Sequence, residues 1–322
     1  MEYSKLNDII KSSKNILIIS HVNPDGDTLG SMIGLYCAIL ENFKKKCDML
    51  TVSKLPDVYS YLPHYSEIKH IDEVDKSREY NLVINVDVAA LDRACDGKIL
   101  FEKAKHTVNV DHHKTNIAYG ELNFINPDAS STGEVLFNCF ENMGWKVNLD
   151  CAICLYTAIL TDTGSFRFDN TKPKTFETAA KLVEIGVQPS DIYKKVYESD
   201  SKTLVMFQSH CISKAKFLQN DKIAYTTVYR KDMELFSAGD DCMEGLTEKL
   251  RAIVTTRIAF VAKEMKSGWT KISMRSKFAD VAQICAKFDG GGHKYAAGCT
   301  IKAHVDEAVK KLLGEIKKVK EL

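Results

Sequence analysis

Short apolar segments alternate with helix-like segments through the first half of the chain, and this alternation constrains the fold more than any other feature. Residues 15–20 form an apolar run that is too short for a helix and rich in β-branched side chains, and residues 47–53, 80–86 and 106–110 are further strand candidates. Residues 28–40 carry apolar side chains at helical spacing, and Ser131-Thr-Gly-Glu134 is typical of a capping box that begins a helix. This order predicts an α/β fold with a mainly parallel sheet and helices on both faces.

The pattern changes near Gly186-Val-Gln-Pro189, where a second region begins. A helical pattern over residues 190–217 precedes further expected strands at 223–229, 258–263 and 270–275, and a final helix is expected over 305–319. A length of 322 residues suits two domains of ordinary size. We therefore predict an N-terminal domain over residues 1–188, a helical linker over 189–218 and a smaller α/β domain over 219–322.

Composition excludes several classes of protein. The chain has 44 Lys and Arg residues against 43 Asp and Glu residues, and this formal net charge of +1 argues against a broad basic surface for long nucleic acid. No apolar run approaches the roughly 20 residues that span a bilayer. Ten cysteines without a signal-like segment before them predict buried thiols in a reduced cytoplasm, and core packing is the simpler account of the Cys151-Ala-Ile-Cys154 pair.

Acidic and imidazole side chains follow the ends of the expected strands. The first strand leads into His21-Val-Asn-Pro-Asp25-Gly-Asp27, the strand over 80–86 ends at Asp87, and the next ends at Asp111-His-His113. A further carboxylate, Asp162, follows the apolar segment 152–160. Because ligands bind beyond the carboxyl ends of the strands in open α/β sheets, we expect these side chains to share one crevice.

Each of these motifs has an ordinary structural interpretation when it is taken alone. Pro24-Asp-Gly-Asp27 makes a good turn, Asp87 could cap a helix, and the two histidines could simply pack. The combination favours a metal site, because gathered carboxylates repel one another unless cations neutralise them. Carboxylates and imidazoles without thiolates suit Mn²⁺, Mg²⁺, Fe²⁺ or Co²⁺, and this number of ligands suits two ions about 3.5–4 Å apart, as in enzymes that hydrolyse phosphoesters.

Taken together, these motifs resemble those of the DHH phosphoesterases. The resemblance rests on Ser20-His-Val-Asn-Pro-Asp-Gly-Asp-Thr-Leu-Gly-Ser31, Asp87, Asp111-His-His113 and Thr161-Asp-Thr-Gly-Ser165. In the second region, Phe288-Asp-Gly-Gly-Gly-His293-Lys-Tyr-Ala-Ala-Gly298 is similar to the associated DHHA1 domain. Chain length and motif order are most similar to the branch of bifunctional oligoribonucleases and pAp phosphatases, the nanoRNase type.

The resemblance implies a role for each residue of the site. It places His21, Asp25 and Asp87 around one divalent metal ion, and it places Asp27, Asp87, His112 and Asp162 around a second. Asp111 would orient an imidazole by accepting its free N–H, and His113 would make a supporting contact in the centre. The catalytic set is therefore Asp87, Asp111, His112 and His113.

The second domain is expected to bind the substrate. Gly290-Gly-Gly292 lets backbone N–H groups approach a phosphate without interference from Cβ atoms, although a glycine run alone is more often a flexible turn. The family resemblance favours phosphate binding by Gly290, Gly291, Gly292 and His293. Arg275 offers a bidentate fork for phosphate, and Ser130 is a further candidate for substrate contact.

The resemblance implies a cytoplasmic hydrolase with two divalent ions, for which we expect Mn²⁺ and keep Mg²⁺ and Co²⁺ open. It would degrade short single-stranded oligonucleotides of about 2–5 nucleotides to nucleoside 5′-monophosphates and dephosphorylate 3′-phosphoadenosine 5′-phosphate (pAp) to AMP. One alternative is a phosphodiesterase for linear dinucleotides (pApA or pGpG) or cyclic dinucleotides, and another is a nucleotide-binding regulator without turnover. No long nucleic acid and no membrane is expected as a partner, and a homodimer stays open.

Overall fold

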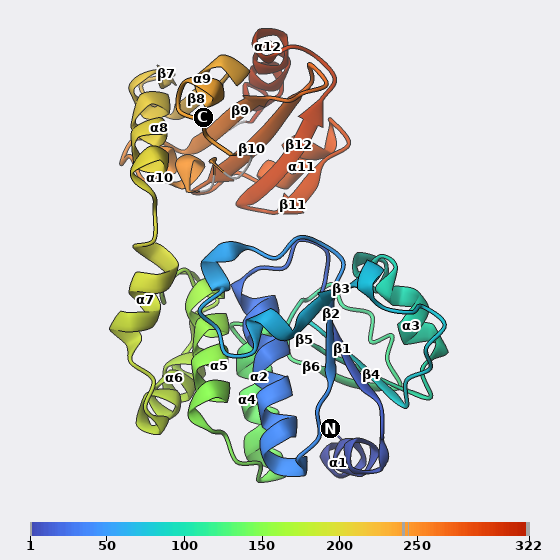
Figure 1. Cartoon of the computed structure of the whole chain (residues 1–322). Coiled ribbons are helices and arrows are strands. Elements are labelled where there is room, and N and C mark those ends of the chain that lie inside the picture. Colours follow the sequence, from blue (N-terminus) through green and yellow to red (C-terminus); the bar gives the residue numbers. More distant parts are fainter. Residues whose placement is uncertain (1, 240–241, 244, 320–322) are drawn as a thin grey trace. The chain divides into compact units, whose positions relative to one another are not determined.

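The computed structural model describes residues 2–239, 242–243 and 245–319. The chain divides into two compact units, Met1–Ser199 and Asp200–Leu322, each with its own six-stranded sheet (Figure 1). No helix among these residues is both long enough and apolar enough to cross a bilayer.

The first unit is built on a parallel sheet in the order β3-β2-β1-β4-β5-β6. Its strands are β1 (Ile16–Ile19), β2 (Asp48–Thr51), β3 (Ile68–His70), β4 (Leu82–Val86), β5 (His106–Asp111) and β6 (Leu122–Ile125). Its helices are α1 (Tyr3–Ser12), α2 (Gly26–Phe43), α3 (Gly97–Lys103), α4 (Thr132–Met143), α5 (Leu149–Asp162), α6 (Pro173–Ile185) and α7 (Pro189–Tyr197). Short 3₁₀ turns lie at η1 (Asp57–Tyr59), η2 (Tyr65–Glu67), η3 (Ile71–Glu73) and η4 (Leu91–Ala94).

Both faces of this sheet are covered, as the strand and helix alternation predicted. Alternate residues of a strand point to opposite faces. In β1, Ile16 and Ile18 belong to the core formed with α1, α2, α4 and α5, whereas Leu17 and Ile19 belong to a second core on the α3 side. The predicted strands over 15–20, 47–53, 80–86 and 106–110 correspond to β1, β2, β4 and β5, and β3 and β6 were not anticipated.

Helices α2 and α5 approach each other at backbone distance. A Cβ atom on Gly30 would lie 2.4 Å from the carbonyl oxygen of Cys154, so only glycine fits there. Cys151 and Cys154 are buried thiols within this contact, and the Cys151 thiol donates to the carbonyl of Gly34. The Cys-X-X-Cys pair is therefore part of the core, as expected.

The second unit has a mixed sheet in the order β11-β12-β10-β9-β8-β7, in which only β8 and β9 are parallel neighbours. Its strands are β7 (Lys216–Leu218), β8 (Ile223–Val228), β9 (Ile258–Glu264), β10 (Thr270–Ser276), β11 (Gly291–His293) and β12 (Ala296–Ile301). Its helices are α8 (Lys202–Ser213), α9 (Arg230–Leu235), α10 (Leu246–Arg251), α11 (Val281–Ala286) and α12 (Val305–Ile316).

The helical pattern over 190–217 corresponds to two helices and the start of a strand. The segment contains α7 in the first unit, α8 in the second unit and the start of β7. The break falls at Glu198–Ser201, where the Ser201 side chain accepts a hydrogen bond from the Leu204 N–H and so begins α8 as an N-cap. A polar N-cap residue therefore begins a second helix inside the helical pattern.

Candidate metal centre

One group of ligand atoms gathers beyond the end of β1. His21, Asp25 and Asp87 each place one donor atom within 4.8 Å of the others. Asp25 is the exposed N-cap of α2, whose Thr28 N–H donates to its carboxylate, and Asp87 follows β4 directly. The His21 Nε2 atom lies 3.3 Å from an oxygen of Asp87. These are the residues expected around the first metal ion.

The Thr28 hydroxyl lies in the middle of this group. It is 2.6 Å from an oxygen of Asp87, 2.7 Å from His21 Nε2 and 3.0 Å from Asp25. Sequence reasoning did not single out Thr28. Its place three residues after an N-cap aspartate was the available signal, because that spacing turns the side chain back toward the cap.

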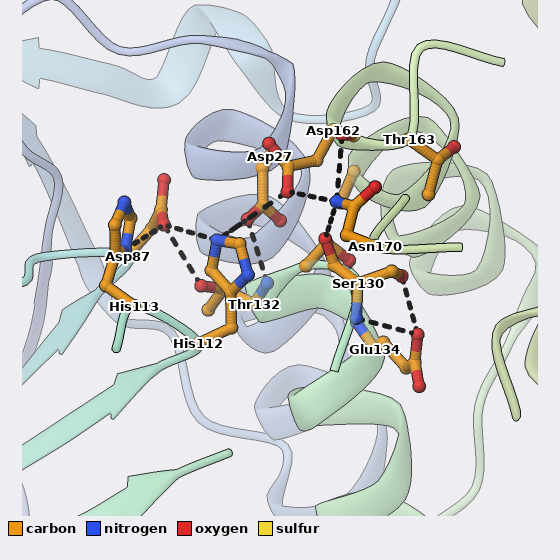
Figure 2. Close-up of polar contacts among 12 residues, drawn as sticks. Asp27, Asp87, His112, His113, Ser130, Thr132, Glu134, Asp162, Thr163 and Asn170 are labelled. Carbon is orange, nitrogen blue, oxygen red and sulfur yellow. Dashed lines mark hydrogen bonds and ion pairs between the residues drawn. The ribbon is translucent and has the colours of Figure 1, made fainter. Parts of the chain in front are cut away.

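A second group lies between β5 and the end of α5. Asp27, His112 and Asp162 also place donor atoms within 4.8 Å of one another, and His112 Nε2 is 3.7 Å from Asp27 and 3.6 Å from Asp162 (Figure 2). The same nitrogen is 3.8 Å from Asp87, so Asp87 lies next to both groups. The ligand set expected for the second metal ion is therefore brought together, with Asp87 in the position expected of a bridge.

The beginning of α4 fixes Asp27. The carboxylate, which is 2% exposed, accepts hydrogen bonds from the backbone N–H groups of Thr132 and Gly133 and from the Ser31 hydroxyl. The free N–H groups and the positive dipole at a helix N-terminus stabilise such a carboxylate. The Thr132 hydroxyl donates to Asp87 at 3.1 Å, so the same turn contacts both acids (Figure 2).

Asp111 holds the ring of His113. Its Oδ1 atom lies 2.7 Å from His113 Nδ1 and accepts from the His112 N–H, while Oδ2 accepts from Asn116. His113 Nδ1 is 3.5 Å from Asp87, and Asp87, His112 and His113 form a third group with donor atoms within 4.8 Å of one another. The geometry thus leaves His113 open as a ligand or as a supporting residue.

The buried acids differ in how easily they ionise. Burial, together with the charges of Asp87 and Asp25, raises the pKa of Asp162 to about 8. Burial and the charges of Asp87 and Asp162 also raise the pKa of Asp27 well above its ordinary value. For Asp87 burial acts in the same direction, but hydrogen bonding and charge interaction with His21 outweigh it and lower the pKa.

The histidines show the reverse competition. Burial would lower the pKa of His113, yet its hydrogen bond to Asp111 and the charge of Asp87 raise it to about 9. Burial dominates at His112 and lowers its pKa, which favours the neutral ring that can ligate a metal. A buried set of mutually repelling carboxylates beside a neutral imidazole is a donor set that divalent cations fit, because they offset the repulsion.

Behind these ligands lies a support network that sequence reasoning missed. The Asn170 side chain donates to the carbonyl of Ser130 and to both the carbonyl and the carboxylate of Asp162. The Glu134 carboxylate accepts from the N–H and hydroxyl of Ser130 (Figure 2). It also accepts from the Thr175 hydroxyl. The network therefore ties the end of α5 to the beginning of α4.

Ser130 belongs to this network and is fully buried. The Ser130 hydroxyl donates a hydrogen bond to Glu134. The structure therefore places Ser130 behind the metal ligands and not at an open surface. The expected capping box is half formed: Ser131 accepts from the Glu134 N–H, but the Glu134 side chain turns to Ser130.

The predicted phosphate-binding residues lie at one edge of the second sheet. Gly291, Gly292 and His293 form the exposed edge strand β11, which pairs with β12. A Cβ atom on Gly290 would lie 2.3 Å from the carbonyl oxygen of Gly298, and Gly292 has a φ of +140°, whereas a Cβ on Gly291 would meet open space. Gly291–His293 is thus a short strand at the end of the sheet order, and no strand in the described part of the chain pairs with its outer side.

Arg275 lies near this edge but has a partner. Arg275 of β10 is paired with Ala296 of β12, and Ala296 is paired on its other side with His293 of β11. Its Nε atom donates to Glu248 of α10 at 2.6 Å and Nη1 donates to the carbonyl of Met274. The roles of Arg275, the glycines and His293 in substrate binding stay predictions.

Comparison with known families identifies both halves of the chain. Residues 15–159 match the model of the DHH family, N-terminal domain, and residues 220–320 match that of the DHHA1 domain. The resemblance inferred from the motifs is therefore confirmed.

Individual relatives cover almost the whole chain. A Thermus thermophilus protein named bifunctional oligoribonuclease and PAP phosphatase NrnA is 30% identical over 306 residues, which are 94% of this chain and 89% of that protein. The Bacillus subtilis protein of the same name is 29% identical over 290 residues, 89% of each chain. The crystal structure of an exopolyphosphatase-related protein from Bacteroides fragilis has a TM-score of 0.93 and 25% identity, covering 98% of this chain and 95% of that one.

Proposed function

Because the chain belongs to the DHH family and carries its DHHA1 domain, we propose that it is a metal-dependent phosphoesterase. It hydrolyses short oligonucleotides to nucleoside 5′-monophosphates and converts pAp to AMP, the two activities in the name of its relatives. The observation that carries this proposal is the meeting of two ligand groups at Asp87: His21 and Asp25 on one side, Asp27, His112 and Asp162 on the other.

The residues of the proposed metal centre have different roles. Asp25, Asp27, Asp87 and Asp162 supply negative charge for two divalent ions, for which we propose Mn²⁺ because the set combines carboxylates and imidazoles without a thiolate. When bound, such ions lower the pKa of water and offset the charge that develops on phosphate oxygens. Asp111 fixes the ring of His113, and Thr28 fixes the orientation of Asp87.

The second unit would hold the rest of the substrate. Gly291 offers backbone N–H groups and the exposed His293 offers an imidazole to a phosphate. Arg275 would contact the same phosphate if its guanidinium left Glu248. The near-neutral chain suits a substrate with few phosphates.

One experiment separates this function from its alternatives. Purified protein with Mn²⁺ is given RNAs of 2 to 24 nucleotides, pAp, pApA and pyrophosphate, and mononucleotide and phosphate release are measured. We expect turnover of pAp and of the shortest RNAs. Activity on pApA far above all other substrates would favour the dinucleotide phosphodiesterase, and ligand binding without any product would favour a non-catalytic regulator.

The remaining expectations concern the location of the protein in the cell and its oligomeric state. A cytoplasmic location is supported by buried thiols such as Cys37, Cys151 and Cys285, which are unpaired. Light scattering coupled to gel filtration would decide between a monomer and a homodimer.

A further inference from the structure

A cavity of about 460 Å³ in the second unit borders the glycine run. Apart from Gly290, none of its lining residues has a place in the function described above. Residues from β10, from β12 and from the segment before β11 line it, among them Trp269, Lys271, Phe288, Gly290, Thr300 and Lys302.

Part of the lining comes from the face of β10 and β12 that carries Lys271 and Thr300. Lys271 faces Thr300 across the pair β10–β12, and because alternate residues share a face, Trp269 and Lys302 extend the same surface. The intervening residues Ile272 and Cys299 also line the cavity, and their side chains belong to the core on the α11 and α12 side. On the side that carries Lys271, the apolar cluster beneath α8 and α10 contains residues of β8 and β9 and, among the described residues, none of β10 or β12.

The chemistry of the cavity suits a nucleotide. Neither Lys271 nor Lys302 has an acidic group within 4 Å in the described part of the chain, and Asp289 is the one acid in the lining. The Trp269 side chain is 42% exposed, and the Lys302 ammonium lies 5.3 Å from the centre of its ring. Exposed indoles stack on bases, and ammonium groups attract phosphates.

We propose that this cavity is a further nucleotide subsite, in which Trp269 stacks on a base while Lys271 and Lys302 hold the adjoining phosphate. The proposal rests on the proposed function, because it assigns the cavity to the same oligonucleotide substrate. β12 connects the two places: Gly298 pairs with Gly291 of the glycine strand, and Lys302 lies four residues further along. At about 3.4 Å per residue this is roughly 14 Å.

That span relates the subsite to the length of the substrate. A stacked single strand advances about 3.4 Å per nucleotide, so roughly 14 Å corresponds to about four steps. A pentanucleotide anchored at the glycine strand reaches Trp269, whereas a dinucleotide does not. The subsite therefore makes affinity rise with length up to about five nucleotides and no further.

The test measures binding to the full-length chain with chelator present, so that no turnover occurs. Anisotropy of labelled di- and pentanucleotides gives the ratio of the two affinities. Trp269→Ala should reduce this ratio about tenfold, the loss of one stacked base. Lys271→Gln and Lys302→Gln should each lower the slope of log affinity against log salt by about 0.7. Lys310→Gln on α12, against the opposite face, is the matched control and should leave the slope unchanged.

The outcomes separate this proposal from the proposed function. An unchanged affinity ratio in Trp269→Ala, or an equal change in slope for Lys310→Gln, overturns the subsite even if pAp is hydrolysed normally. Length-dependent binding that needs Trp269, in a protein that hydrolyses nothing, supports the subsite and overturns the proposed function. Trp269→Phe keeps a ring and should restore most of the ratio, which shows that any loss in the alanine variant is not a folding defect.

Discussion

The two units handle charge in opposite ways. In the first, the two central acids of the metal centre are buried: Asp27 and Asp87 are each 2% exposed, and each has several hydrogen-bond partners. In the second, the groups that we assign to the substrate lie on an edge strand and an open sheet face, and His293, Lys271 and Lys302 are exposed. Burial costs free energy for a charge, whereas exposure costs little.

This difference teaches where function and stability conflict. Grouped buried carboxylates destabilise the metal-free first unit, and the cations that complete the site remove that cost. The exposed groups that we assign to the substrate in the second unit would add affinity without such a conflict. Substitutions in the first unit should therefore change turnover, metal requirement and stability together, and those on the open face should change affinity alone.

Asp87→Asn should give the largest effect. The amide keeps the shape of the side chain and tolerates the backbone φ of +61°, but it removes the charge shared by both ligand groups. We expect turnover of pAp to fall by about 1000-fold or more, since the ions provide several kcal/mol of charge stabilisation. Asp92→Asn, whose parent carboxylate is 86% exposed, is the control. A variant that does not fold, judged by circular dichroism, would make Asp87 a structural residue.

Asn170→Ala should have the next largest effect. Removing the amide frees Asp162 and separates the end of α5 from Ser130, so turnover should fall by about 10–100-fold and half-maximal activity should need more Mn²⁺. Asn142→Ala on the exposed side of α4 is the matched control. Reduced stability with an unchanged metal requirement would contradict a positioning role.

Substitutions of two neighbouring glycines test whether stability and substrate binding can be changed separately in the second unit. Gly290→Ala places a methyl group against the Gly298 carbonyl and should destabilise the second unit by about 1–3 kcal/mol in urea unfolding. Gly291→Ala enters open space and should change stability by less than about 0.5 kcal/mol. Gly291→Val should weaken substrate binding more than metal binding. Equal losses of both would argue against phosphate binding at β11.

The pH dependence of the metal-free protein is the smallest expected effect. Because the pKa of Asp162 is raised to about 8, this group contributes stability that is fully present below pH 4. That contribution is lost as the pH rises through 8. The pKa of His113 is raised to about 9, so its imidazole also contributes stability. This contribution is fully present below pH 6.5 and is lost as the pH rises through 9. The melting temperature in chelator should thus fall from pH 5 to pH 9.

Solvent limits the size of this pH effect, because the Asp162 side chain is 30% exposed. Asp162→Asn should flatten the curve, and added Mn²⁺ should flatten it in the parent protein. A melting temperature that rises over this range without metal would show that the acids do not repel one another as described.

The grouping of several candidate ligands could be predicted from the sequence, because His21, Asp87, His112 and His113 follow the ends of parallel strands. Asp87 and His112 follow parallel strands whose carboxyl ends share one edge, so a count of strands was enough to bring them together. Asn170 and Glu134 could not be found in this way. They lie in a loop and a helix, are typical of caps and turns, and are connected to the site only by tertiary contacts.

The second unit was harder to predict for a related reason. A strand is inferred from alternating side chains, and Gly290-Gly-Gly292 has none, so β11 gave no signal. The edge strand forms because β12 offers a partner, which is a property of the sheet and not of the segment.

The backbone contact between α2 and α5 has a consequence for how the enzyme loses activity on heating. Gly30 allows the two helices to touch without an intervening layer of side chains, and Asp27 and Asp162 lie on these helices. At Gly30 the two backbones meet directly, so no side chain at this point of contact can loosen before the rest of the unit. We therefore expect the separation of the two acids to stay constant until the whole unit unfolds, and heat to abolish activity in one cooperative step.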